Sequence, residues 1–149
     1  MLQTGEEAFQ QWSPSDSLYG SRAFVENMKR KGTLSQVRAM FLLDMIGDRE
    51  LVLEKDYSST SWLVDLVWQS ARELGYQKHL SSFPKAMDDD HVPFLRAGIP
   101  SVDLIDFEYG FNNLYWHTAN DTLDKVSPKS LKVAGDILLR SLEKLCSRP

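Results

Sequence analysis

Val37-Arg38-Ala39-Met40-Phe41-Leu42-Leu43-Asp44-Met45-Ile46 is the stretch that decides the fold. Its apolar run, residues 39–43, predicts a strand buried on both faces, and Gly47-Asp48 then turns the chain. Strands of this kind are typical of parallel sheets whose faces are covered by helices. Because strand and helix patterns alternate on either side of it, the sequence predicts an α/β layer fold with a largely parallel sheet.

The apolar spacing before and after this strand predicts the remaining elements. Helices are expected over residues 17–30, 61–74 and 127–145, and a short helix over 91–97 that Asp90 can cap. Ser127 as N-cap with Pro128 in the first helical position is a strong start signal. Residues 51–53 and 100–105 are predicted strands, whereas 79–85 is ambiguous. Residues 107–115 form a Gly/Asn/aromatic loop of the sort that carries function.

Size and composition restrict the class of protein. The chain has 149 residues, which suits a single domain, and 42% of them are hydrophobic, so a core can form. The formal net charge is −4 and the sequence has no long basic run, which argues against nucleic acid or an anionic membrane as the main partner. No apolar run is long enough to span a bilayer. The single cysteine, Cys146, excludes an intrachain disulfide.

Acidic residues and histidines fall at strand ends and in loops, where parallel sheets place their ligand sites. The clusters are Glu6-Glu7, Asp44, Asp88-Asp89-Asp90-His91 and Trp116-His117. Asp44 follows the most apolar run of the chain, so its carboxylate needs a cation or hydrogen-bond donors to stay ionised. His79 has no acidic neighbour in the sequence and is not a candidate ligand.

Each cluster also has an interpretation without function. Adjacent glutamates such as Glu6 and Glu7 are common on solvated faces. The run from Asp88 to Asp90 could serve only as a helix N-cap with acids that complement the helix dipole. His117 could be an exposed imidazole in a simple turn. The residue types alone leave these alternatives open.

Longer motifs carry a resemblance. The segments Gly5-Glu6-Glu7-Ala8-Phe9, Trp12-Ser13-Pro14 and Asp16-Ser17-Leu18-Tyr19-Gly20-Ser21-Arg22 resemble the glutaminyl cyclase signature. Residues 43–47, 89–100 and 116–122 are similar to segments of the wider M28 zinc aminopeptidase superfamily, in the same order. The resemblance implies a three-layer fold, with a mostly parallel mixed sheet flanked by helices, of which the N-terminal strands are missing. Residues 1–149 would then be the C-terminal portion of a single M28-like catalytic domain.

The resemblance also implies roles for particular residues. Glu7 and His117 would be zinc ligands and Glu6 the acid/base, while a third ligand, an aspartate, would come from a segment that precedes this chain. Asp44 would pair with Asp89 or Asp90 in a catalytic hydrogen-bond network.

A further set of residues would hold the substrate. Trp12 and Trp116 would wall the pocket for the substrate's first side chain, and the loop 107–115 with Phe111 would form its rim. Asp103 stands where animal cyclases have a histidine in the pocket network. Thr4 replaces the aspartate that is usual before Gly-Glu-Glu.

The implied reaction converts the N-terminal glutamine of a peptide or protein into pyroglutamate, with loss of ammonia and with one zinc ion as Lewis acid. The alternative enzyme is a di-zinc M28 aminopeptidase with two zinc ions. A third possibility is an inactive truncated fragment, because a sheet without its first strands exposes an apolar edge. Relatives of this kind are usually secretory or periplasmic.

Overall fold

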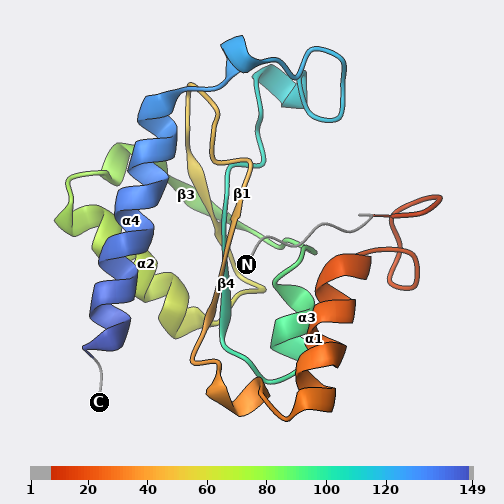
Figure 1. Cartoon of the computed structure of the whole chain (residues 1–149). Helices are drawn as coiled ribbons and strands as arrows, with labels where there is room; N and C mark the ends of the chain where they lie inside the picture. The colour runs from red at the N-terminus through yellow and green to blue at the C-terminus, as the bar shows by residue number, and fades with distance from the viewer. Residues whose placement is uncertain (1–7, 148–149) are drawn as a thin grey trace.

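The protein is built around a four-stranded mixed sheet, which the computed structural model describes over residues 8–147 (Figure 1). The strand order is β1-β4-β2-β3. β1 pairs with β4 and β2 with β3 in parallel, whereas β2 and β4 run antiparallel. The strands are β1 (Met40–Asp44), β2 (Leu53–Asp56), β3 (Leu80–Lys85) and β4 (Ser101–Ile105). The predicted α/β architecture with a largely parallel sheet is therefore confirmed.

Helices cover both faces of the sheet. Figure 1 shows α2 and α4 on one side and α1 and α3 on the other. The helices are α1 (Tyr19–Lys31), α2 (Ser61–Glu73), α3 (Val92–Arg96) and α4 (Pro128–Cys146). Short 3₁₀ turns occupy η1 (Leu34–Gln36), η2 (Gln77–His79), η3 (Phe111–Asn113) and η4 (Leu123–Lys125). None of the helices in the described part of the chain combines the length and the apolar composition that a bilayer crossing requires.

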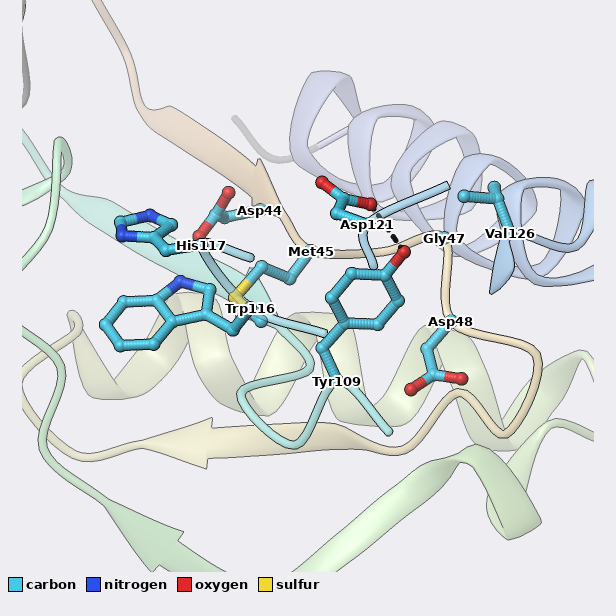
Figure 2. A pocket seen from close by; sticks show the side chains of 9 residues that line it. All are labelled: Asp44, Met45, Gly47, Asp48, Tyr109, Trp116, His117, Asp121 and Val126. Atoms are coloured by element: carbon cyan, nitrogen blue, oxygen red, sulfur yellow. Dashed lines mark hydrogen bonds between the residues drawn. The ribbon is translucent and has the colours of Figure 1, made fainter. Parts of the chain in front are cut away.

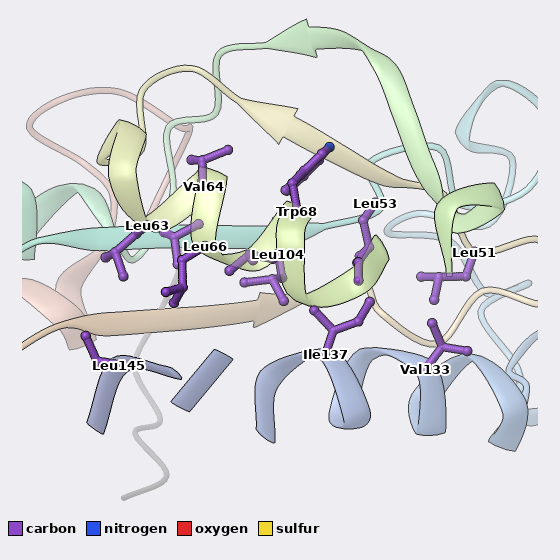
Figure 3. Packing of buried hydrophobic residues seen from close by; sticks show 13 residues of the cluster. Leu51, Leu53, Leu63, Val64, Leu66, Trp68, Leu104, Val133, Ile137 and Leu145 are labelled. Carbon is purple, nitrogen blue, oxygen red and sulfur yellow. The ribbon is translucent and has the colours of Figure 1, made fainter. Parts of the chain in front are cut away.

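The main core lies between the sheet and the α2/α4 layer (Figure 3). Leu104 of β4, Leu63 of α2 and Ile137 of α4 are each fully buried in it. A smaller cluster on the other face joins Val25 of α1 to Phe94 of α3 and to Ile99. The two clusters fix the sheet between its helical layers, so the strand ends that carry the polar residues are held in place.

The start signal of the last helix acts as predicted, and the first helix ends at a glycine. The Ser127 side chain accepts a hydrogen bond from the Lys129 backbone N–H, and Pro128 is the first residue of α4. Gly32 has a φ of 65° and its N–H bonds back to the Lys29 carbonyl, which closes α1. The predicted strand 100–105 is β4, and the ambiguous segment 79–85 is the strand β3.

Two local predictions were wrong. The apolar strand over residues 37–46 is shorter, Met40–Asp44, and each of its residues is only partly buried, because β1 has one neighbour, β4, among the described strands. The strand buried along its whole length is β4, which lies between β1 and β2. Asp90 does not cap α3, since His91 occupies the N-cap position and the Asp89 carbonyl accepts the Val92 N–H.

Candidate functional site

A cavity of about 960 Å³ lies at the carboxyl ends of β1 and β4. Asp44 and Ile105, the last residues of these strands, line it. Trp12, Asp89 and His117 come to it from three separate loops. The parallel pairing of β1 with β4, which sets Asp44 opposite Ile105, brings these chain-distant segments to one edge of the sheet.

A smaller cavity of about 300 Å³ adjoins the first and shares Asp44, Trp116 and His117 with it. Figure 2 shows the Asp44 carboxylate and the His117 ring on the same side of this cavity. The Trp116 indole stacks on the His117 ring, with ring centres 4.2 Å apart, and Trp116 also contacts Phe107 at 5.5 Å. An imidazole and a carboxylate therefore face a shared space with an aromatic wall.

The loop that carries His117 is held by its own hydrogen bonds. The Tyr109 hydroxyl donates to Asp121 Oδ1 at 2.7 Å, and the Tyr109 N–H donates to the Asn113 side chain (Figure 2 for the first bond). His117 itself has a φ of 53°, which costs strain in a residue other than glycine. Gly110, at a φ of 70°, lies where a Cβ atom would come within 2.5 Å of the Tyr115 ring. These contacts hold the backbone from which the imidazole projects.

Two carboxyl groups in or behind the cavity, the partly buried Asp89 and the buried Asp103, have raised pKa values. Burial raises the pKa of Asp89 to about 6, with the Asp44 and Asp90 charges adding to the effect. Burial raises the pKa of Asp103 to about 9, and the nearby carboxylates of Asp89, Asp44 and Asp56 raise it further. Asp103 therefore holds its proton at neutral pH, whereas Asp89, with a pKa of about 6, is mostly ionised there.

Sequence reasoning named His91 in a cluster but gave it no role, and it missed Asp56. His91 is fully buried, with Nε2 3.1 Å from Asp56 Oδ2 and Nδ1 4.0 Å from Asp103 Oδ2. Burial raises the pKa of Asp56, but the contacts with His91, Ser59 and two backbone N–H groups outweigh it and lower the pKa to about 2. The only sequence signal was the histidine at the end of the aspartate run.

The structure brings most of the predicted site residues together. Six of them line the larger cavity: Trp12, Asp44, Asp89, Asp90, Trp116 and His117. Asp103 is buried on β4 and does not line it. Phe111 lines neither cavity, because its side chain is 83% exposed.

The glutamate pair, Glu6 and Glu7, lies outside the described residues. Within residues 8–147, no group of three His, Cys, Asp or Glu side chains is placed to hold a metal ion. His117 and Asp44 nevertheless offer an imidazole and a carboxylate on one cavity, which are the ligand types that zinc takes. The donor set that the described residues supply fits a zinc site completed by further ligands.

Comparison with known proteins places the chain in a well-defined group. The profile of "Peptidase family M28" matches residues 1–142. The crystal structure of a glutaminyl cyclase from an Acidobacteriales bacterium is similar over 95% of this chain and 50% of that one, with 42% identity and a TM-score of 0.91. The glutaminyl-peptide cyclotransferase of Boiga irregularis is 31% identical over 90% of this chain and 41% of its own length.

Peptidases of the same fold are also similar. A Zn-dependent exopeptidase from Parabacteroides distasonis matches 97% of this chain and 50% of its own, with 26% identity and a TM-score of 0.78. The chain spans about half the length of these solved structures and 41% of the Boiga relative.

Proposed function

The chain belongs to peptidase family M28, and we propose that it is part of a zinc-dependent glutaminyl-peptide cyclotransferase, which converts N-terminal glutamine into pyroglutamate and releases ammonia. The observation that carries this proposal is the cavity between Trp12 and Trp116, on which His117 and the Asp44/Asp89 carboxyl groups converge. The 42% identity with the Acidobacteriales glutaminyl cyclase supports the same choice.

The residues that would hold zinc are His117 and Glu7, with one ion in the cyclase. Once bound, zinc supplies Lewis-acid polarisation of the substrate's γ-amide carbonyl. The stacking of His117 on Trp116 fixes the plane of the imidazole, so the ligand is oriented before the metal arrives. Asp44 faces the same space and adds negative charge that favours a cation.

The aromatic walls would bind and orient the glutamine side chain. Trp12 and Trp116 are 43% and 40% exposed and line the cavity together with Phe107. Flat apolar surfaces of this kind exclude water and hold the chain of the glutamine folded toward its own amine. In the reaction the α-amine nitrogen bonds to the γ-amide carbon, and that carbon's bond to the amide nitrogen breaks, so proximity within one molecule supplies much of the rate.

The proton released by the amine must reach the departing ammonia. Glu6 would take it and hand it on as general base and then general acid. Asp89, whose pKa is raised to about 6, would share a proton with Asp44 and stabilise the tetrahedral intermediate by hydrogen bonding. Asp103, protonated at neutral pH behind them, would keep this carboxyl cluster from carrying a full set of negative charges.

The acid/base role is tested by Glu6→Gln in the protein as its gene encodes it. Turnover of a Gln-peptide should vanish while zinc content, measured by atomic absorption, stays near one per molecule. Glu50→Gln, an exposed glutamate outside both cavities, is the matched control and should retain activity. Retained turnover in the Glu6 variant would refute the role.

A second candidate is a di-zinc aminopeptidase, favoured by the similarity to the Zn-dependent exopeptidase and by the position of Asp44 next to His117. The cyclase and the aminopeptidase can be distinguished by assays with peptides that begin with Gln or Leu and by measuring the number of zinc ions per molecule. Ammonia release from the Gln-peptide with one zinc supports the cyclase. Hydrolysis of the Leu-peptide with two zinc ions supports the peptidase. No turnover of either, in a preparation of residues 1–149 alone, would identify the chain as an inactive fragment.

The proposed function also implies a class of substrate and a cellular compartment. The substrates would be the N-termini of peptides or proteins, and the protein would be located in the secretory pathway or the periplasm. Residues 1–149 would belong to a single M28-like catalytic domain.

A further inference from the structure

The segment before α1 folds back onto one carboxylate. Asp16 Oδ1 accepts the Phe9 N–H at 2.7 Å, and Oδ2 accepts the Gln10 and Gln11 N–H groups at 2.8 and 3.1 Å. Successive backbone N–H groups that converge in this way form a concave anion site, and here the anion is the chain's own side chain. The residues that follow Glu6-Glu7 are thereby drawn toward the start of α1.

The carboxylate is itself held firmly. The Tyr19 hydroxyl donates to Asp16 Oδ1 at 2.8 Å, and the Asp16 N–H donates to Ser13 Oγ at 3.0 Å. Arg22 Nη1 donates to the Ser17 carbonyl at 3.2 Å, which ties the turn to the first helical turns of α1. Residues 16–22 resemble the cyclase signature but have no role in the proposed chemistry. Their hydrogen bonds join the turn before α1 to the start of that helix.

Trp12 follows the three anchored amides directly. Its indole lines the large cavity, is 43% exposed, and has one long hydrogen bond, from Nε1 to Asp88 Oδ2 at 3.4 Å. This hydrogen bond is a weak constraint on the indole, so its position depends strongly on the backbone that carries it. Ala8, Gln10 and Gln11 line the same cavity, so the anchored segment is one wall of it.

We propose that Asp16 is a positioning residue: its carboxylate holds residues 8–12 in place so that Trp12 stands as a preformed wall of the substrate cavity. Asp16 does not line the cavity itself. As a claim about substrate binding it rests on the proposed function, whereas the anchoring of the segment stands independently of it.

The anchor stays charged over the whole working range. The hydrogen bonds from the Phe9, Gln10 and Gln11 backbone N–H groups lower the pKa of Asp16 to about 2. The position of residues 8–12 should therefore not change with pH, and any change of activity between pH 5 and pH 9 must come from the titration of other groups.

Asp16→Asn tests the proposal in the intact protein, because the amide keeps the size of the side chain and replaces one acceptor oxygen by a donor. Asp124→Asn is the control: Asp124 is exposed and, like Asp16, has a pKa lowered to about 2, but its partners are the Lys125 and Thr122 side chains. Backbone hydrogen exchange of residues 9–11, followed by mass spectrometry, should become about tenfold faster or more in Asp16→Asn only.

Steady-state kinetics supply the functional arm. KM for a Gln-peptide should rise about tenfold in Asp16→Asn, with a smaller change in kcat and unchanged zinc content, because a displaced wall weakens binding. Tyr19→Phe, which removes one of the four donors, should give an intermediate effect.

The exchange and kinetic measurements test the anchoring of residues 9–11 and the positioning of Trp12 separately. Unchanged exchange at residues 9–11 in Asp16→Asn, or the same acceleration in Asp124→Asn, would overturn the anchoring. Faster exchange with unaltered KM would overturn the positioning role. If the wild-type protein does not cyclise Gln-peptides, the proposed function fails, and acrylamide quenching of Trp12 in both variants, referenced to Trp12→Phe, decides whether the wall is displaced.

Discussion

Replacing Asp103 by asparagine should abolish a pH dependence of stability that the buried carboxyl imposes. Asp103 is fully buried on β4, and its pKa is raised from 3.8 to about 9 by burial and by the neighbouring carboxylates. The folded protein therefore binds a proton that the unfolded chain has lost over the range between these values. Because the folded state binds more protons there, the free energy of unfolding falls as the pH rises.

The size of the effect follows from the linkage relation. One pKa unit corresponds to about 1.4 kcal/mol, so between pH 7 and pH 9 the carboxyl should remove about 2 kcal/mol from the free energy of unfolding. Asparagine is neutral and nearly the same shape, so it has no proton to lose. The pKa values of Asp89 and Asp106 are raised to about 6, so both titrate mainly below this window.

The assay is urea unfolding followed by circular dichroism at pH 7, 8 and 9, extrapolated to water. The free energy of unfolding of the wild type should fall between pH 7 and pH 9 by about 2 kcal/mol more than that of Asp103→Asn. Asp65→Asn removes an exposed carboxylate and should keep the wild-type slope. Parallel curves for wild type and Asp103→Asn would refute the reasoning, since the carboxyl would then be ionised in the folded protein already at pH 7.

Two further substitutions test the loop and the core. Tyr109→Phe removes the hydroxyl that donates to Asp121 at 2.7 Å, so it should lower the free energy of unfolding by about 1 kcal/mol and speed proteolysis of the loop. Tyr57→Phe, which changes an exposed ring, should have neither effect. Ile137→Ala leaves a cavity in the fully buried core and should cost about 2–5 kcal/mol in urea unfolding, against less than about 0.5 kcal/mol for Leu139→Ala on the exposed side of α4. Equal losses for the two α4 variants would contradict the packing.

The helices and the layer architecture could be predicted because their signals are local. Ser127-Pro128 marks the start of α4 by residue type alone, and the helix begins there. The burial of β1 could not be read in the same way. The apolar residues of a strand can be read from the sequence, but their burial depends on the neighbouring strands in the sheet. Among the described strands, β1 has only β4 beside it.

The site was predictable only as far as motifs reach. The resemblance singled out Asp44, Asp89 and His117, and all three line the large cavity. The contact of His91 with Asp56 was out of reach, because it depends on where the start of α3 lies relative to the end of β2 in the folded protein. A contact between residues 35 positions apart has no local signature in the chain.

The sheet order has a consequence during synthesis on the ribosome. Met40 of β1 pairs with Ser101 of β4, so the partner of β1 is made 61 residues later. At about 5–20 residues per second, a nascent chain waits roughly 3–12 s before that partner has been translated. Throughout this delay the most apolar segment of the polypeptide has no β4 to pair with, which makes it a natural target for chaperones that hold emerging chains.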